Sequence, residues 1–401
     1  MSLIDGRAAP SSALPAPAPE GHPIRDALLV VMLLVPLIAA GAGAFVSRGL
    51  ETLVFENRKA HPWPALPANS SMRDLTSAFE RAFNDRFGGR GYLARLHHAI
   101  AARVFRTSSV ATVMLGRDDW IYWIGEDSKA LDRHFRGVVP LRTPVESIAG
   151  EFVRRNDALA ARGIPYVVAI VPDKFTIYPE HLPQWVERAA TTPLDRVRDA
   201  LRADGRVRFV DMRPALEAAK PSRRLYYLTD SHWNFAGAAA GYEAIMREVQ
   251  RALPGRLHAI APVRWPPYVP GVDMYSGDLG AFLGVRWFFR EDDAAPLWKV
   301  LADAPSRCAQ SVGPPPYLAG VQVEVYECPR QNLPTAVVWH DSMGPPLIPL
   351  VSENFRRIVW ILGRDFDPAI VDAERADIVI QETVERGLDE LPSFIPSPRP
   401  R

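Results

Sequence analysis

Cysteine is scarce in this 401-residue chain: there are only two, and they do not combine with His residues at the spacing of a zinc site. The sequence also lacks a Gly-rich phosphate-binding loop and a basic stripe interleaved with aromatic residues. Its 47 Lys and Arg residues nearly balance 46 Asp and Glu residues, so net charge offers no attraction for a polyanion. The sequence therefore predicts no metal, no cofactor and no nucleic-acid partner.

The two cysteines, Cys308 and Cys328, lie in a stretch rich in Pro and Gly, where a loop can readily be closed. A bridge between them would close about 20 residues and stabilise the fold by roughly 3 kcal/mol in the chain-entropy model. Such a disulfide would indicate an oxidising compartment. The alternative is two separate buried thiols.

The N-terminal region changes character near residue 26. Residues 1–25 are rich in Ala, Pro, Ser and Gly without apolar periodicity, which predicts a disordered tail. An uncharged apolar run of 20 residues, Ala27 to Val46, is long enough to cross a bilayer. A cleaved signal peptide is the alternative, because Ala42-Gly43-Ala44 fits a cleavage site. We favour an uncleaved transmembrane anchor at residues 26–47, since the run exceeds a usual signal-peptide core. The few flanking charges do not set its orientation.

Helical and strand patterns alternate from residue 144 onward. Apolar β-type runs predict strands at 164–171, 207–211, 336–339, 357–361 and 377–381. Amphipathic segments between them predict helices, among them 145–161, 194–203, 214–219 and 235–253. This alternation predicts an α/β fold, a three-layer α/β/α sandwich on a mostly parallel sheet. The stretch 254–334 has many Pro and aromatic residues and no clear period.

Two further patterns precede this region. Apolar residues at helical spacing over 73–105, interrupted by Gly88-Gly89, predict two helices with a glycine joint. The runs 110–115 and 120–124 flank a short polar turn and predict a β-hairpin.

A carboxylate and an imidazole stand two residues apart in the segment from Leu228 to Asn234, just before the helix predicted at 235–253. Residues two apart in extended backbone face the same side, so Asp230 and His232 can line one pocket. Asn234 fits the N-cap position of the following helix.

The run 336–339 leads into His340-Asp341-Ser342-Met343-Gly344. Sites in parallel sheets lie at the carboxyl ends of strands, which is where Ser342 falls. A serine hydroxyl needs an imidazole to remove its proton, and the imidazole needs a carboxylate to fix its tautomer. We therefore predict Ser342 as nucleophile, His232 as base and Asp230 as the orienting acid.

These segments resemble the SGNH hydrolase-like domain of the alginate O-acetyltransferase family, the AlgJ/AlgX type. That family carries Asp-(Ser/Thr)-His-Trp for its acid and base and, later, an Asp-Ser nucleophile turn. Other segments resemble the family in the same order: Glu56-Asn57-Arg58, Asp85 to Arg90, Leu115 to Tyr122, Val171-Pro172-Asp173-Lys174, Tyr178-Pro179-Glu180, Gly277-Asp278-Leu279 and Ala376 to Arg386. The sequence departs from the pattern at His340, where the family often has Gly, and at Met343, where Phe is common.

The resemblance implies one SGNH-like acetyltransferase domain at residues 52–392 and a C-terminal tail at 393–401. It implies acetylation of a secreted, alginate-like polysaccharide through an acyl-serine, in the bacterial periplasm at the inner membrane. A partner of the membrane-bound O-acyltransferase kind would deliver the acetyl donor. Lys174, Tyr178 and Trp233 become candidates for substrate contacts, although Trp233 more readily packs to fix the His232 loop.

Backbone N–H groups of Ser342 and Gly344 are predicted to stabilise the oxyanion, a contribution of about 3–4 kcal/mol per donor. Asp341 can support the nucleophile turn. A carbohydrate acetylesterase would use the same triad, since only the acceptor differs, water or a sugar hydroxyl. A non-catalytic polysaccharide-binding or scaffold subunit of an export complex is the third possibility, but it would have no need of all three triad residues.

Overall fold

The computed structural model describes residues 52–53, 58–64, 71–86, 90–125, 129–257, 277–284 and 308–391, with residues 260, 263 and 291 and parts of a helix between residues 27 and 38. The chain divides into two compact units, Met1–Leu93 and Ala94–Arg401. The domain predicted at 52–392 therefore begins in the first unit and lies mostly in the second. The predicted tails at 1–25 and 393–401 lie outside the described residues.

The first unit contains a short antiparallel pair, β1 (Thr52–Leu53) and β2 (Arg58–Lys59), and helix α2 (Met72–Arg86). Helix α3 (Arg90–Arg103) begins in this unit and ends in the second. The two predicted helices are thus confirmed, while their joint at Gly88-Gly89 lies outside the described residues.

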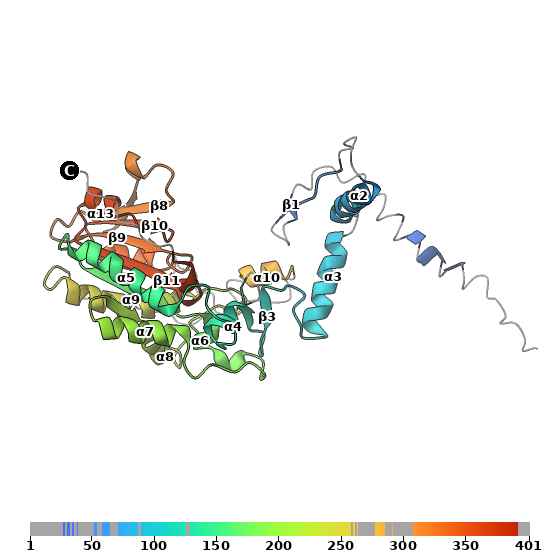
Figure 1. The fold of residues 1–401 in the computed structure, drawn as a ribbon, viewed down its shortest axis with the longest axis horizontal. Coiled ribbons are helices and arrows are strands. Elements are labelled where there is room, and N and C mark those ends of the chain that lie inside the picture. Colours follow the sequence, from blue (N-terminus) through green and yellow to red (C-terminus); the bar gives the residue numbers. More distant parts are fainter. Residues whose placement is uncertain are drawn as a thin grey trace, which may run out of the picture. The chain divides into compact units, whose positions relative to one another are not determined.

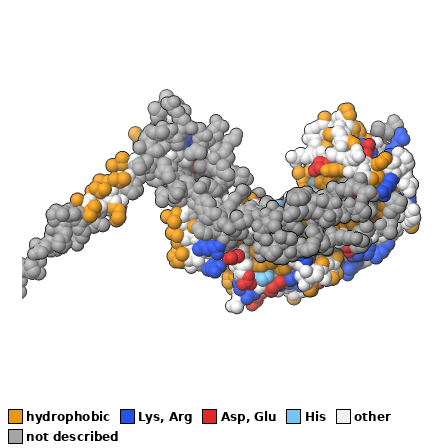
Figure 2. All heavy atoms as spheres, turned by 180° about the vertical axis from the view of Figure 1, so that it is seen from behind, with side chains coloured by type: hydrophobic (Ala, Val, Ile, Leu, Met, Phe, Trp, Pro, Cys, Tyr) orange, Lys and Arg blue, Asp and Glu red, His pale blue; other side chains and the backbone are white. Residues whose placement is uncertain are grey.

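The predicted membrane anchor falls largely outside the described residues. Those that are described are helical and expose their apolar side chains, as Figure 2 shows; Leu28 is 64% exposed and Ile38 66%. Within the described part of the chain, no helix combines the length and apolar character needed to span a membrane. The anchor at residues 26–47 stays a prediction.

The second unit is built on a seven-stranded sheet of order β6-β5-β11-β9-β10-β8-β7 (Figure 1). The strands are β5 (Tyr166–Val171), β6 (Arg208–Asp211), β7 (Gln310–Val312), β8 (Val323–Glu327), β9 (Thr335–His340), β10 (Arg357–Leu362) and β11 (Ile378–Val384). The first five in the order run parallel, and β8 and β7 extend the sheet antiparallel. The mostly parallel sheet is confirmed, whereas β7 and β8 lie in the stretch 254–334, where no strand was predicted.

Helices cover both faces of this sheet. One face packs against α8 (Arg213–Ala219), α9 (Phe235–Ala252) and α12 (Ile348–Val351), and the other against α5 (Val145–Ala160), α7 (Pro193–Asp204) and α13 (Pro368–Glu374). Alternate residues of β5 belong to the two cores, Val167 to one and Val168 to the other. Every residue of β5, β9 and β11 is buried, as strands covered on both faces require. The predicted three layers are present.

Short elements complete the second unit. Strands β3 (Val113–Leu115) and β4 (Ile121–Trp123) form the predicted hairpin, with Asp118 and Asp119 in left-handed conformation at φ 56° and 61°. Further helices among the described residues are α4 (Ala130–His134), α6 (Lys174–Ile177), α10 (Asp278–Phe282) and the 3-10 turns η1 (Pro179–His181), η2 (Pro316–Leu318), η3 (Ser352–Asn354) and η4 (Glu385–Glu390).

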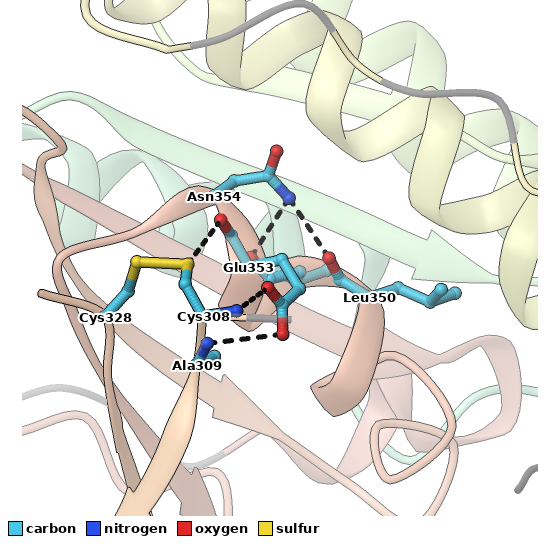
Figure 3. The surroundings of a disulfide bond; sticks show 7 residues. Cys308, Ala309, Cys328, Leu350, Glu353 and Asn354 are labelled. Atoms are coloured by element: carbon cyan, nitrogen blue, oxygen red, sulfur yellow. Dashed lines mark hydrogen bonds between the residues drawn. A yellow bond between two sulfur atoms is a disulfide. The ribbon is translucent and has the colours of Figure 1, made fainter. Parts of the chain in front are cut away.

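Cys308 and Cys328 form the predicted disulfide, which Figure 3 shows. One cysteine precedes β7 and the other follows β8, so the bridge closes the antiparallel edge of the sheet. The Glu353 carboxylate accepts the Cys308 N–H at 2.7 Å and the Ala309 N–H at 3.3 Å. The disulfide thus joins the outer ends of β7 and β8, and the Glu353 hydrogen bonds join this edge of the sheet to η3.

Candidate active site

The segment with Asp230 and His232 forms a tight loop in front of α9. A β-bridge between Tyr226 and Trp233 closes this loop. The Asn234 side chain then accepts two N–H groups of the first turn of α9, at 2.9 and 3.1 Å, which confirms the predicted N-cap. Bridge and cap together fix both ends of the loop.

Asp230 and His232 form a hydrogen-bonded pair. Nδ1 of His232 lies 2.6 Å from Oδ1 of Asp230, and the same oxygen accepts the His232 backbone N–H at 3.0 Å. Burial alone would raise the pKa of the Asp230 carboxyl, but the hydrogen bond and charge of His232 outweigh burial and hold this pKa well below its usual range. Nε2 of His232 is buried and has no hydrogen-bond partner among the described residues. The imidazole is thus oriented by a carboxylate and has one nitrogen left to accept a proton.

Ser342 lies two residues after the end of β9 and is exposed, whereas its neighbours Asp341 and Met343 are buried. It opens into a groove of about 530 Å³ lined by Gln322, Asp341, Ser342, Leu362, Gly363, Arg364, Asp365 and Glu390. The predicted nucleophile is therefore accessible from solvent at the carboxyl end of a central strand.

The Asp-x-His loop and the serine turn meet through Trp233. Its Nε1 donates a hydrogen bond to the Met343 carbonyl oxygen at 2.9 Å. The residue after His232 thereby binds the residue after Ser342, across 110 positions of sequence. Trp233 is fully buried, so it fixes the loop and offers no platform for a sugar. The structure brings the predicted acid, base and nucleophile into adjoining loops.

Asp341 holds the serine turn against β11. Its carboxylate accepts the Met343 N–H at 3.0 Å and, on the other oxygen, the Val384 N–H at 2.8 Å and the Thr383 hydroxyl at 3.3 Å. The Asp341 N–H donates to Oε2 of Glu382 at 3.1 Å. Burial, followed by the charge of Asp341, raises the pKa of Glu382 well above its usual value. Asp341 thus has the predicted supporting role, and β11 supplies its partners.

Gly344 stands where only glycine fits. Its N–H donates to the Asp341 carbonyl oxygen at 3.0 Å, and Nδ1 of His340 lies 2.8 Å from the same oxygen. A Cβ at Gly344 would collide with the His340 ring. The Gly344 N–H, one of the two predicted oxyanion donors, is therefore engaged inside the turn in this structure. Ser342 N–H is the predicted donor that remains.

Lys174 follows β5 and is buried, at 3% exposure. Its Nζ donates to the carbonyl oxygens of Ile121, Leu228 (2.8 Å) and Asp230 (3.0 Å). Burial lowers the pKa of Lys174 to about 7, and nearby carboxylates, Glu291 first among them, oppose this shift only in part. The amine is bonded to backbone carbonyls, and Lys174 is not among the residues that line the groove. Lys174 thus positions the Asp230 loop, and the predicted contact with substrate finds no support in this placement.

Tyr178 is also buried, at 5% exposure. Its hydroxyl accepts the Leu225 N–H at 2.9 Å, and its ring stacks on Trp120 with centres 4.4 Å apart. Tyr178 therefore belongs to the packing behind the site. The sequence pattern cannot predict this packing role, because a tyrosine that follows a strand can equally be buried or bind substrate.

Gly277 and Asp278 are site residues to which the sequence pattern gave no role. The Asp278 N–H donates to Oδ2 of Asp230 at 3.1 Å, and a Cβ at Gly277 would collide with Asp230. Asp230, His232 and Asp278 are the described residues whose ligand atoms could hold a metal ion, since these atoms lie within 4.8 Å of one another. The hydrogen bonds among these residues account for their arrangement without an ion.

Residues 113–300 match a family model described as an SGNH hydrolase-like domain, acetyltransferase AlgX; this range contains Asp230 and His232 and ends before Ser342. The probable alginate O-acetylase AlgJ of Pseudomonas fluorescens is 28% identical over 211 residues, which cover 52% of this chain and 50% of that protein. AlgJ of Pseudomonas aeruginosa is 25% identical over 362 residues, covering 79% of this chain and 86% of that protein.

The chain spans about half the length of the matched AlgJ proteins of Pseudomonas fluorescens and Pseudomonas syringae. Among solved structures, the O-acetyltransferase domain of Pseudomonas putida AlgJ is 20% identical with a TM-score of 0.42, covering 69% of this chain and 92% of that one. The family match and the curated relatives confirm the resemblance that the motifs indicate, namely a similarity to the AlgJ/AlgX type of SGNH hydrolase-like domain.

Proposed function

We propose that this protein is an O-acetyltransferase that adds acetyl groups to a secreted, alginate-like polysaccharide through an acyl-serine at Ser342. The observation that carries the proposal is the hydrogen bond from Trp233 to Met343, which joins the acid–base loop to the serine turn. Relatives named as probable alginate O-acetylases favour this reaction and this class of acceptor.

In the first half-reaction, the Ser342 hydroxyl attacks the carbonyl carbon of the acetyl donor while Nε2 of His232 takes its proton. Asp230 stabilises the imidazolium that results. The Ser342 N–H donates to the oxyanion of the tetrahedral intermediate. The bond to the donor's leaving group then breaks, His232 returns the proton to that group, and acetyl-Ser342 remains.

In the second half-reaction, a sugar hydroxyl gives its proton to His232 and attacks the acetyl carbon. The bond to Ser342 breaks, the serine oxygen regains the proton, and the O-acetylated sugar leaves. The groove of about 530 Å³ at Ser342 is open to solvent and has room for such an acceptor. Water in place of the sugar would make the same site an acetylesterase.

The proposal includes the compartment. The catalytic domain would lie in the periplasm, held at the inner membrane by the anchor at residues 26–47, and a partner of the membrane-bound O-acyltransferase kind would bring the acetyl group. The disulfide between Cys308 and Cys328 favours an oxidising compartment.

The test is to incubate the purified full-length protein with p-nitrophenyl acetate, with and without an alginate oligosaccharide, and to follow both products by mass spectrometry. We expect acetylated oligosaccharide with the wild type and with Ser311→Ala, a control on the exposed strand β7, and none with Ser342→Ala. Acetate release that ignores the oligosaccharide would instead identify an esterase. A folded wild type that binds the oligosaccharide but turns over no acetyl ester would identify a scaffold.

A further inference from the structure

A second carboxylate faces the His232 imidazole from outside the predicted triad. Oδ2 of Asp278 lies 3.8 Å from Nδ1 of His232, the nitrogen that Asp230 holds at 2.6 Å. The Ser231 hydroxyl contacts both Asp278 and His232: it donates to Oδ2 of Asp278 at 2.6 Å, and its oxygen is 3.3 Å from Nδ1 of His232. One imidazole nitrogen therefore has two carboxylates within reach.

Asp278 is held in this place by several bonds. Its Oδ1 accepts the Ser231 N–H at 2.8 Å, and its own N–H donates to Asp230 at 3.1 Å. The Thr229 hydroxyl accepts the Gly277 N–H at 2.9 Å, and two more N–H groups of α10 donate to the Thr229 carbonyl oxygen at 3.1 Å. Gly277 and the start of α10 are thus hydrogen-bonded to three successive residues, Thr229, Asp230 and Ser231.

The groups around Asp278 act on its pKa in opposite directions. Burial, and then the negative charge of Asp230, raise the pKa of Asp278 above its usual value, while the hydrogen bond from Ser231 and the charge of His232 oppose this rise. The charges of Lys174 and Arg386 also interact with this carboxyl. In acyl transfer His232 must accept and then release a proton, and a nearby negative charge favours the protonated form.

We propose that Asp278 is a positioning residue for the Asp230–His232 pair: it fixes Ser231 and Asp230, and its negative charge stabilises the imidazolium. The proposal rests on the acyl transfer proposed above and adds a fourth side chain to that site. It also gives the Gly277-Asp278 segment a function, because Gly277 permits the close approach to Asp230.

The test is the pH dependence of Ser342 sulfonylation by phenylmethylsulfonyl fluoride in the full-length protein, followed by intact mass. This reaction needs the Ser342–His232 pair but neither an acetyl donor nor an acceptor. In Asp278→Asn we expect the acidic limb of the rate profile to move to lower pH by about one unit, because the imidazolium loses a neighbouring negative charge. Asp278→Glu keeps the charge and should leave the limb in place. Ser231→Ala keeps both carboxylates and should slow the reaction without moving the limb.

An Asp278→Asn protein whose rate falls equally at every pH would overturn the proposal, because a merely structural contact has that effect. A profile identical to that of the wild type would overturn it too. Thermal melting checks the fold of each variant, and Asp278→Ser supplies a second uncharged variant if Asn does not fold. A wild type that is sulfonylated at Ser342 yet transfers no acetyl group would refute the proposed function and leave the result on Asp278 intact.

Discussion

Replacing Lys174 by Met removes a buried amine and keeps a side chain of similar length. After the substitution, the Leu228 carbonyl oxygen still accepts the Ile121 N–H at 2.9 Å. The carbonyl oxygens of Ile121 and Asp230 lose the hydrogen bond that Lys174 donates. A buried acceptor left unsatisfied costs about 1–3 kcal/mol, which is the loss expected at the Ile121 carbonyl alone. The substitution also removes the burial of a cation, which offsets part of that loss.

The offset depends on pH. The pKa of Lys174 falls from 10.5 to about 7 in the folded protein, so keeping the amine charged there costs about 5 kcal/mol. Between pH 7 and pH 9 the unfolded chain keeps this proton while the folded protein releases it, so the stability of the wild type rises with pH. Since Lys174→Met lacks the group, the wild type should gain about 2 kcal/mol over the variant across this interval.

Guanidinium unfolding of both full-length proteins at pH 7, 8 and 9, followed by Trp fluorescence, measures this difference. The matched control is Lys220→Met, because Lys220 also donates to a carbonyl, that of Ile177 at 2.6 Å, but is only partly buried and pairs with Glu180. We expect the difference in free energy of unfolding between Lys174→Met and wild type to grow with pH, and Lys220→Met gives the cost of losing a partly buried lysine donor under the same conditions. Lys174→Met should also lose at least about tenfold in acetyl-ester turnover, since the Asp230 loop loses an anchor. A constant difference between Lys174→Met and wild type would contradict the lowered pKa, and full turnover would contradict the positioning role.

Four further predictions concern the site, the disulfide and the anchor. Ser342→Ala should remove nearly all turnover of an acetyl ester, and adding His232→Ala should cost little more, because such groups act as one unit; additive losses in folded proteins would count against the triad. Turnover by the wild type should weaken in acid, where a protonated imidazole cannot accept the serine proton, and a flat profile down to pH 4 would speak against a histidine base. Cys308→Ser should lower the free energy of unfolding by roughly 3 kcal/mol in urea, and freely alkylated Cys308 and Cys328 in the wild type would refute the bridge. Carbonate-washed membranes should retain the full-length chain through residues 26–47, whereas a shortened soluble form would reveal cleavage.

The parallel strands were predictable because each is a run of apolar residues buried on both faces. Strands β5, β9 and β10 match their predicted ranges to within two residues at either end. The last strand, β11, extends to Val384, beyond the predicted end at Gln381, because Glu382 and Thr383 are buried polar residues that bond the serine turn. A prediction based on apolar runs therefore ends this strand too early, at its first polar residues.

The antiparallel edge was not predictable in the same way. Residues 310–312 are exposed or partly buried, and within 323–327 only Val325 is buried. These spans are short, lie among prolines and contain no continuous apolar run. Their position depends on pairing with β10 and on the disulfide, both of which are contacts between distant residues.

The motifs allow a triad of Asp230, His232 and Ser342 to be predicted from residue type and spacing, and it stays a prediction. The motifs do not reveal what surrounds these three residues. The burial of Lys174 and Tyr178 depends on the β3–β4 hairpin lying over them, where Lys174 bonds Ile121 and Tyr178 stacks on Trp120. Strand-end position alone places both residues near the site and cannot say whether they face the groove or the core.

Strand β11 comes last in the chain yet lies between β5 and β9, in the middle of the sheet. Until residues 378–384 have been synthesised, β5 and β9 have no neighbour between them, and Asp341 lacks the partners that hold the serine turn. Pairing across such long sequence separations is slow and cannot begin early. Turnover of an acetyl ester should therefore appear only after residues 378–384 have been synthesised and have paired with β5 and β9.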